Sequence, residues 1–531
     1  MKYLILSAMV FASTTLFAQK NKKTKSPAQD WYQQGMQKSN MGIDLYKAYE
    51  SLPANAPAKD IIVAVIDGGT DINHPDLKAN LWHNPGEIPF NGIDDDHNGY
   101  TDDTVGWNFI GGADGKMVEF DNLEKTRILR TLMKKYSEMD ASDINDPVKR
   151  AEYEHYQKLK TDVEQNRLTY LGLLTAQLEP AIKALDDMRE SMGKTNPSRE
   201  DLEKYNPTDP QNIALKSILL KALEKDGITF EAIYEQIREP YDQVYAMAHY
   251  HYNTDYDPRS IVGDNYENAS ERYYGNNNVA GGDPFHGTHV AGIIGAVRNN
   301  GLGVNGVADH VKIMVVRVVP NGDERDKDVA NGIRYAVDNG ARILNMSFGK
   351  SYKWNKAVVD SAVAYAVSKG VLLVHAAGND NQNNDLDANY PNDSLGNGQF
   401  ASTWLEIGAS APEKKKLATD FSNYGQHNVD LFSPGYKIYS TAPGTIYKFS
   451  DGTSMAAPVA SGVAALVWSR YPNLTAEQLK EILMKSSVVN KKKVVLPGTK
   501  STKIRFTRLS VSGGLINADR ALKLAAATSG K

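Results

Sequence analysis

Four short runs of almost continuously apolar residues constrain the fold of this chain more than any other feature. The runs, all rich in β-branched residues, are "DIIVAVIDGGT" at 60–70, "KIMVVRVV" at 312–319, "RILNMSFG" at 342–349 and "VLLVHAAGN" at 371–379. Strands buried on both faces of a parallel sheet have this composition. Helical patterns lie between the runs, for example at 326–339 and 355–369. The alternation of strand and helix predicts an α/β fold, a parallel β-sheet with helices on both faces.

Polar side chains stand at the ends of three of these predicted strands. Asp67, Ser347 and Asn379 each lie near the carboxyl end of an apolar run. In parallel α/β sheets, ligands bind beyond the carboxyl ends of the strands. We therefore expect a functional site at this edge of the sheet.

The stretch from residue 114 to residue 280 differs in composition from the rest of the chain. It is rich in Lys, Glu, Asp, Tyr and Leu at helical spacing and has few β-branched runs. The pattern predicts a large, mostly helical insertion at 114–280, inside a main domain formed by 59–113 and 281–526. Residues 19–58 form a separate, polar N-terminal segment.

The N-terminus has the pattern of a secretory signal peptide. Lys2 supplies a positive charge, residues 4–12 are mostly apolar, and Ala18 offers a small residue for cleavage. The pattern predicts a signal peptide at 1–18 and an exported chain, periplasmic or extracellular; an N-terminal anchor helix is the alternative. No later run reaches the roughly 20 apolar residues that a membrane span needs, so we expect no span in the mature chain.

Charge and cysteine content exclude several classes of function. The formal net charge is −4, with 60 basic and 64 acidic side chains, which gives no sign of a nucleic-acid-binding surface. The chain contains no cysteine, which excludes thiol catalysis, cysteine-ligated metals and disulfides. An exported protein without disulfides needs another means of holding its long loops.

Three polar residues at rigid positions could form a nucleophilic site. Ser454 begins the apolar, helical stretch in "SDGTSMAAPVASG" (450–462), His286 begins another in "FHGTHVAGIIGA", and Asp67 ends a strand. A serine hydroxyl becomes a good nucleophile when an imidazole takes its proton, and a carboxylate holds that imidazole in the right tautomer. Taken alone, Ser454 is equally compatible with a simple helix N-terminal residue. Asn379, with the backbone N–H of Ser454, could stabilise an oxyanion.

Four motifs together make the sequence resemble the subtilisin-like serine proteases, the subtilases. They are "VIDGG" around Asp67, "HGTHVAG" around His286, "AAGN" ending at Asn379 and "GTSMAAPVASG" around Ser454, and they occur in the subtilase order. The resemblance implies a secreted serine endopeptidase that acts on protein or peptide substrates and needs no cofactor for catalysis. The alternative is a catalytically silent protein that keeps the fold and binds peptides or a surface partner. His289, on the same predicted helix as His286, is interpreted as structural rather than as a second base.

The resemblance also implies where a substrate binds. The strand "NMSFG" (345–349) looks like the edge that pairs with the substrate backbone, and main-chain pairing of this kind demands little of the substrate sequence. One wall of a primary pocket would be formed by Ser347, Phe348 and Gly349. The other wall would be formed by Ala376, Ala377 and Gly378, and Asn389 would lie at the base.

The segment "NGIDDDHNGYTDD" (91–103) resembles the start of an oxygen-rich calcium loop. The predicted ligands of a structural Ca²⁺ are Asp94, Asp96, Asn98, the Tyr100 carbonyl, and Asp102 or Asp103. Val105 occupies the position of the distal Glu, so the loop is not a full EF-hand. An acidic turn without metal is the alternative.

The insertion separates Asp67 from His286, and its role stays open between four possibilities. It could shield the cleft, bind a partner, act as an internal inhibitor in place of a folded N-terminal prodomain, or be a tolerated decoration.

Overall fold

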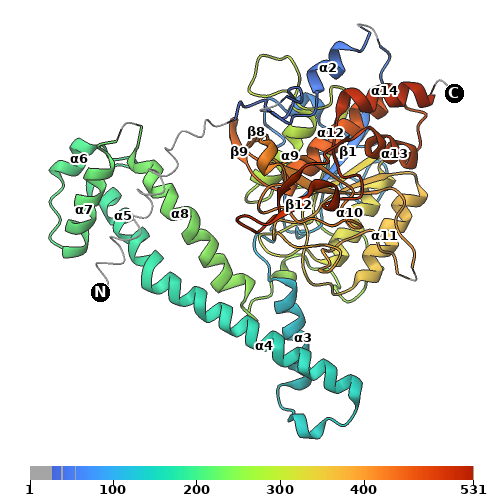
Figure 1. The fold of residues 1–531 in the computed structure, drawn as a ribbon. Helices are drawn as coiled ribbons and strands as arrows, with labels where there is room; N and C mark the ends of the chain where they lie inside the picture. Colours follow the sequence, from blue (N-terminus) through green and yellow to red (C-terminus); the bar gives the residue numbers. More distant parts are fainter. Residues whose placement is uncertain (1–26, 38–39, 54–55, 226, 397, 530–531) are drawn as a thin grey trace. The chain divides into compact units, whose positions relative to one another are not determined.

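The computed structural model describes residues 27–529, except 38–39, 54–55, 226 and 397 (Figure 1). The predicted signal peptide, 1–18, lies outside the described residues. The described chain divides into two compact units. The helical unit comprises residues 125–257, which lie inside the predicted insertion, and the main unit comprises residues 27–124 and the chain from 258 onward.

The main unit is built on a nine-stranded sheet of order β10-β13-β7-β6-β5-β4-β1-β3-β2. All neighbouring strands are parallel except β10 and β13. The strands are β1 (Ile61–Asp67), β2 (Gly106–Asn108), β3 (Val311–Arg317), β4 (Ile343–Met346), β5 (Leu372–Ala376), β6 (Trp404–Ser410), β7 (Leu431–Pro434), β10 (Val488–Val489) and β13 (Gly514–Leu515). Two hairpins lie outside this sheet, β8 (Ile438–Ala442) with β9 (Ile446–Ser450), and β11 (Lys493–Val495) with β12 (Lys503–Arg505).

Helices cover both faces of the sheet, as the sequence predicts (Figure 1). Along β1, Val63 and Val65 belong to one hydrophobic core, and Ala64 and Ile66 belong to the other. The helices of the main unit are α2 (Leu45–Glu50), α9 (Phe285–Gly295), α10 (Asp326–Asp338), α11 (Lys356–Ser368), α12 (Thr453–Arg470), α13 (Ala476–Ser486) and α14 (Ala518–Ser529). Residues of α9, α12, α13 and α14 join the first core, and residues of α10 and α11 join the second. The central strands are therefore mostly apolar, because both of their faces are buried.

Pro458 lies inside α12 and not in its first turn, where the missing N–H of a proline has no partner to lose. Because α12 begins at Thr453, Pro458 is its sixth residue, and the carbonyl of Ser454 loses its usual i+4 donor. The hydroxyl of Ser347 donates to that carbonyl instead, at 3.0 Å. The proline is tolerated because a side chain from the end of β4 replaces the missing amide.

The N-terminal segment packs into the first core of the main unit. Trp31 and Ile43 are fully or almost fully buried there, and the indole Nε1 of Trp31 donates to the carbonyls of Tyr436 and Lys437 at 3.0 and 3.2 Å. The backbone N–H of Ala518, the first residue of α14, donates to the carbonyl of Ile43. The described residues between 27 and 53 are thus part of the folded main unit.

The helical unit has its own core. Its helices are α3 (Glu124–Tyr136), which starts in the main unit, α4 (Pro147–Leu173), α5 (Glu179–Met192), α6 (Arg199–Lys204), α7 (Pro210–Ala222) and α8 (Phe230–Ala246), with π-helical turns at Leu174–Leu178 and Met247–His251. Asp146, Ser198, Asp209 and Thr229 cap helix N-termini with their side chains. Leu185, Met188 and Leu219 are completely buried in its core. Among the described residues of the whole chain, no helix combines the length and apolarity required to cross a membrane.

Candidate active site

Asp67 and His286 form a hydrogen-bonded pair at the carboxyl edge of the sheet, in which Asp67 is buried and the His286 side chain is 42% exposed. Asp67 is the last residue of β1 and is 3% exposed, and His286 is the second residue of α9. The Nδ1 atom of His286 lies 2.8 Å from Oδ1 and 3.0 Å from Oδ2 of Asp67. Gly287 allows α9 to start this close to β1, because a Cβ there would lie 2.1 Å from the carbonyl oxygen of Gly69.

The environment of His286 favours its protonated form. Burial by itself lowers the pKa of the imidazole, but the charge of Asp67 and the hydrogen bond to it act in the opposite direction. Asp283 adds a smaller contribution of the same sign, and the net pKa of His286 is raised above its ordinary value. Because Nδ1 faces a carboxylate, it carries the proton in the neutral ring, which leaves Nε2 as the acceptor.

Ser454 stands at the start of α12, beside the segment that follows β4. Gly452 precedes the helix with φ of 151°, a conformation that strongly favours glycine. The Ser454 hydroxyl donates to the carbonyl of Ser347 at 3.1 Å, and the Ser347 hydroxyl donates to the carbonyl of Ser454. The two residues are therefore held together by a reciprocal pair of hydrogen bonds. The backbone N–H of Ser454 lies in the first helical turn, where amides have no intrahelical acceptor.

The side chain of Asn379 is oriented by Thr453. The backbone N–H and the hydroxyl of Thr453 both donate to Oδ1 of Asn379, at 2.8 and 3.0 Å. A backbone N–H can only donate, so the group facing it is the amide oxygen, and the amide nitrogen of Asn379 is left as a donor on the other side. The Thr453 hydroxyl also accepts from the backbone N–H of Gly378.

The predicted substrate-binding residues lie on three adjacent segments. Ser347, Phe348 and Gly349 follow β4, and Ala376, Ala377 and Gly378 end or follow the neighbouring β5. Asn389 is held against the second of these segments, because its Nδ2 donates to the carbonyls of Ala376 and Ala377, each at 3.3 Å. A Cβ on Gly349 would lie 2.6 Å from Oδ1 of Asn389, so the two segments approach closely.

His289 has the surroundings of a structural histidine. It is completely buried, and its Nε2 lies 3.0 Å from the carbonyl of Lys448 in β9. Burial lowers the pKa of His289 to about 4. The His289 ring therefore stays neutral, and its contact with the Lys448 carbonyl packs α9 against the β8–β9 hairpin.

The sequence model described as the Subtilase family matches residues 58–510. The chain belongs to the subtilase family. Among curated relatives, Thermitase of Thermoactinomyces vulgaris is 39% identical over 186 residues, which cover 35% of this subtilase and 61% of the relative. Subtilisin Savinase of Lederbergia lenta is 33% identical over 239 residues, 45% of this chain and 77% of the relative. The Cell wall-associated protease of Bacillus subtilis (strain 168) is 36% identical over 216 residues, 40% of this chain and 22% of the relative. The matched part thus spans about a fifth to three quarters of these relatives' lengths.

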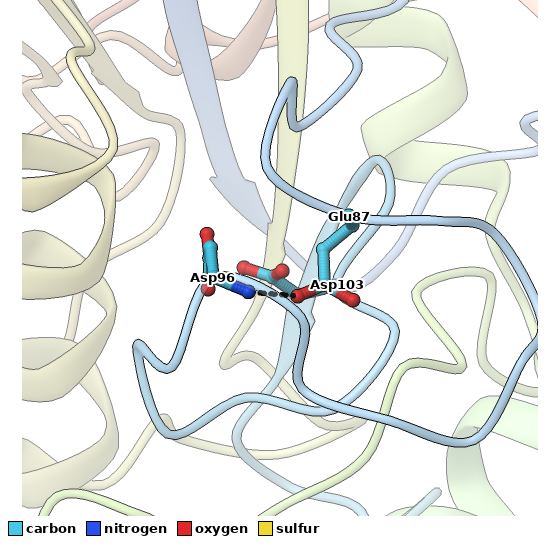
Figure 2. Close-up of side chains that lie close together, drawn as sticks. All are labelled: Glu87, Asp96 and Asp103. Carbon is cyan, nitrogen blue, oxygen red and sulfur yellow. Dashed lines mark hydrogen bonds between the residues drawn. The ribbon is translucent and has the colours of Figure 1, made fainter.

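Away from the active site, three carboxylates converge in the acidic loop of this subtilase. Figure 2 shows Glu87, Asp96 and Asp103 turned toward one another. One oxygen atom from each lies within 4.8 Å of the others. The loop is closed by the side chain of Asn84, whose Nδ2 donates to Asp96 at 2.9 Å and to Asp103 at 2.7 Å. The backbone N–H of Asp96 also donates to Oε1 of Glu87 at 3.4 Å.

The chemistry of this cluster fits a hard divalent cation. All three donors are carboxylate oxygens, and oxygens around one Ca²⁺ lie about 2.3–2.6 Å from it, so separations below 5 Å between them are compatible with a shared ion. Burial raises the pKa of Asp103 to about 6 and also raises that of Glu87, since their negative charges lie out of water and close to other carboxylates. A bound cation would relieve this repulsion.

The other predicted ligands of the loop make hydrogen bonds within turns. The carboxylate of Asp94 accepts from the backbone N–H groups of Asn98 and Gly99, and that of Asp102 accepts from those of Asn91 and Gly92. The side-chain amide of Asn98 donates to Asp96 and Asp103, and the ring of Tyr100 packs against Trp107 and Tyr335. Glu87 was not predicted, because it precedes the recognisable motif and is brought to it by the intervening turn.

Proposed function

We propose that this subtilase is an exported serine endopeptidase that hydrolyses peptide bonds with Asp67, His286, Ser454 and Asn379. The observation that carries the proposal is the pairing of Nδ1 of His286 with buried Asp67 at 2.8 Å, on the edge of the sheet where α12 presents Ser454. The family match and the relatives named as proteases support the same reaction.

The reaction begins with removal of a proton from Ser454. His286 accepts that proton at Nε2, because its Nδ1–H is directed to Asp67. Oγ of Ser454 then attacks the carbonyl carbon of the scissile bond, which forms a tetrahedral intermediate. The imidazolium of His286, stabilised by Asp67, returns the proton to the leaving amine. Water, activated by the same imidazole, hydrolyses the acyl-enzyme and restores Ser454.

The negative oxygen of the intermediate is stabilised by two N–H donors. One is the Nδ2 group of Asn379. Thr453 donates two hydrogen bonds to Oδ1 of the same amide, and this leaves Nδ2 on the opposite side, free to donate to the substrate. The other is the backbone N–H of Ser454 in the first turn of α12. Both donors are fixed before substrate binds, so little reorganisation is needed in the transition state.

The acyl side of the substrate would lie along the segment from Ser347 to Gly349. Its primary side chain would enter between this segment and Ala376, Ala377 and Gly378, with Asn389 at the base. The reciprocal hydrogen bonds between Ser347 and Ser454 support this placement, because a peptide under attack by Ser454 must pass the same segment.

A structural Ca²⁺ in the acidic loop belongs to the proposal. Glu87, Asp96 and Asp103 would hold it, with other oxygens of the 91–103 loop completing the shell. When bound, the ion supplies positive charge that neutralises the carboxylates, and it stabilises the folded state, to which it binds selectively. Such a site would support a chain that has no disulfide.

The test is hydrolysis of a protein substrate, such as casein, by the purified chain. We expect cleavage within the substrate chain, and we expect Ser454→Ala to abolish it while the variant keeps the wild-type circular dichroism spectrum. Cleavage that survives in Ser454→Ala would refute the proposed nucleophile. A folded wild-type chain that cleaves nothing would favour a peptide-binding protein on the same fold.

A further inference from the structure

A buried lysine follows directly after the proposed substrate-binding segment. The side chain of Lys350 is 1% exposed, and its ammonium group lies 2.6 Å from Oε2 of Glu124 and 2.7 Å from Oδ1 of Asp326. It also donates to the backbone carbonyl of Glu324 at 2.7 Å. Glu124 and Asp326 are nearly as buried, with side chains 1% and 6% exposed. One cation thus holds two carboxylates and a carbonyl away from water.

The backbone of Lys350 is part of the walls of the proposed pocket. Its N–H donates to the carbonyl of Tyr390, and the N–H of Tyr390 donates to the carbonyl of Lys350, both at 2.9 Å. This pairing places Gly349 beside Asn389, which is held against the other wall. The position of the Lys350 backbone therefore determines the separation between the Gly349 wall and the base of the pocket.

The partners of Lys350 are themselves firmly held. Oδ2 of Asp326, at the start of α10, accepts from the backbone N–H groups of Trp354 and Asn355, which follow Lys350 in the chain. The backbone N–H of Glu124 donates to Asp323 at 2.7 Å. Lys350 is thus anchored to two rigid elements, the start of α10 and the start of α3.

Glu124 also has a particular place in the sequence. It is the first residue of α3 and the last residue of the main unit before the helical unit begins at residue 125. The carboxylate that fixes Lys350 therefore comes from the segment where the predicted insertion leaves the main unit.

We propose that Lys350 is a positioning residue for substrate binding, and that Glu124, through Lys350, makes the segment leading into the helical unit a structural part of the primary pocket. The inference rests on the proposed function and assigns a role within the same site. Loss of the Lys350 charge removes a cation from beside two buried carboxylates, and relaxation of this cluster displaces Gly349 and Lys350. The reciprocal hydrogen bonds between Ser347 and Ser454 hold the start of this segment, so the displacement falls on Gly349 and Lys350, and Ser454 stays in place.

The test compares Lys350→Met and the milder Glu124→Gln in the full chain, with Lys369→Met as a matched control on the exposed end of α11. Kinetics on a tetrapeptide p-nitroanilide ending in phenylalanine separate KM from kcat. We expect KM to rise about tenfold in Lys350→Met and severalfold in Glu124→Gln, with kcat within about twofold of wild type. In the double variant, KM should match that of Lys350→Met, since Glu124 acts through the lysine.

Two outcomes would overturn the inference. One is a KM unchanged in both variants. The other is a fall in kcat together with an equal fall in the rate of labelling by a small fluorophosphonate. Because that probe does not occupy the pocket, slower labelling would indicate general damage to the active site. If Lys350→Met does not fold, Glu124→Gln decides alone.

Binding of the product-like tetrapeptide acid, labelled with dansyl, separates this inference from the proposed function. In a Ser454→Ala background no catalysis is needed, and we expect Lys350→Met to weaken peptide binding about tenfold. Unchanged binding would refute the role of Lys350, whatever the catalytic activity. Absence of hydrolysis by the wild type with weakened binding in the variant would instead refute the proposed reaction and keep the role of Lys350.

Discussion

At the scale of single residues, the Asp67–His286 pair determines how the active site responds to pH. In the proposed mechanism neutral His286 is the base, so activity requires its deprotonation. Because the charge of Asp67 raises the pKa of His286, kcat/KM should fall as the pH falls through a value above the ordinary histidine pKa of about 6.5. In Asp67→Asn the residual activity should be lower by roughly 10⁴, and its acid limb should move to lower pH. A pH–rate profile of both proteins measures this, and an unmoved limb would contradict the assignment.

Asn379 should affect turnover rather than binding. In the proposed mechanism its amide donates to an oxygen that becomes charged in the transition state. Asn379→Ala should therefore lower kcat by about 10²–10³ with KM nearly unchanged. Asn381→Ala, at a nearby exposed asparagine, is the matched control. A loss that appears in KM alone would assign Asn379 to substrate binding instead.

The candidate catalytic residues are recognisable in the sequence, and two other charged residues are not. Asp67, His286 and Ser454 stand at a strand end and at helix starts, inside motifs whose order is visible in the chain. Glu87 and Lys350 carry no such local signal, because their partners come from other segments. The backbone N–H groups of Asp95 and Asp102, which donate to Glu87, and the carboxylate of Glu124, which accepts from Lys350, explain them only once the chain is folded.

At the scale of elements, α12 depends on a side chain from the end of β4. Ser347→Ala removes the hydroxyl that satisfies the Ser454 carbonyl left free by Pro458, and it removes the acceptor of the Asn345 amide. An unsatisfied buried group costs about 1–3 kcal/mol. Urea unfolding should show a loss of this size, with Ser351→Ala, at an exposed position, close to wild type. A difference below about 0.5 kcal/mol would mean that water or relaxation replaces the hydroxyl.

The acidic loop should make stability depend on calcium. At a calcium concentration 100 times the Kd, binding contributes about 2.7 kcal/mol to the free energy of unfolding, so a chelator should lower the Tm of the wild type. Glu87→Gln and Asp103→Asn should have a Tm that no longer responds to chelation. Asp140→Asn, in an exposed turn of the helical unit, should respond like the wild type. A wild-type Tm that is the same with and without the chelator would favour an acidic turn without metal.

Strands were predicted from the sequence more accurately than the ends and surroundings of the helices. The run at 60–70 contains β1, and the run at 312–319 contains most of β3, because burial on both faces leaves a continuous apolar signal. The β8–β9 hairpin has one largely exposed strand and gave no such signal. The start of α12 depends on Gly452, and the hydroxyl of Ser347 allows Pro458 inside the helix; a hydrophobic periodicity reveals neither.

At the scale of the whole molecule, two units with separate cores should unfold in separate steps. Leu185 is buried in the core of the helical unit, and Leu466 is buried against the sheet of the main unit. Truncation of a buried leucine costs about 2–5 kcal/mol. Calorimetry should therefore show two transitions, with Leu185→Ala lowering one and Leu466→Ala lowering the other. A single transition moved by both variants would mean that the units unfold as one.

The composition change around residues 114–280 indicated a helical insertion, and residues 125–257 form a compact helical unit within it. The flanking segments belong to the main unit because their contacts are with the sheet. The indole of Trp107 on β2, for example, donates to the carbonyl of Tyr274. Such contacts join segments far apart in the sequence, and composition alone does not show them.

The most direct measurement is the site and rate of covalent labelling by a fluorophosphonate probe. Peptide mapping of the labelled chain should place the adduct on Ser454, and labelling should be lost in Ser454→Ala and slowed strongly in His286→Ala. This result would show that the serine at the start of α12 is a nucleophile activated by the histidine that Asp67 holds. A folded chain that is not labelled, or an adduct on another residue, would contradict the account.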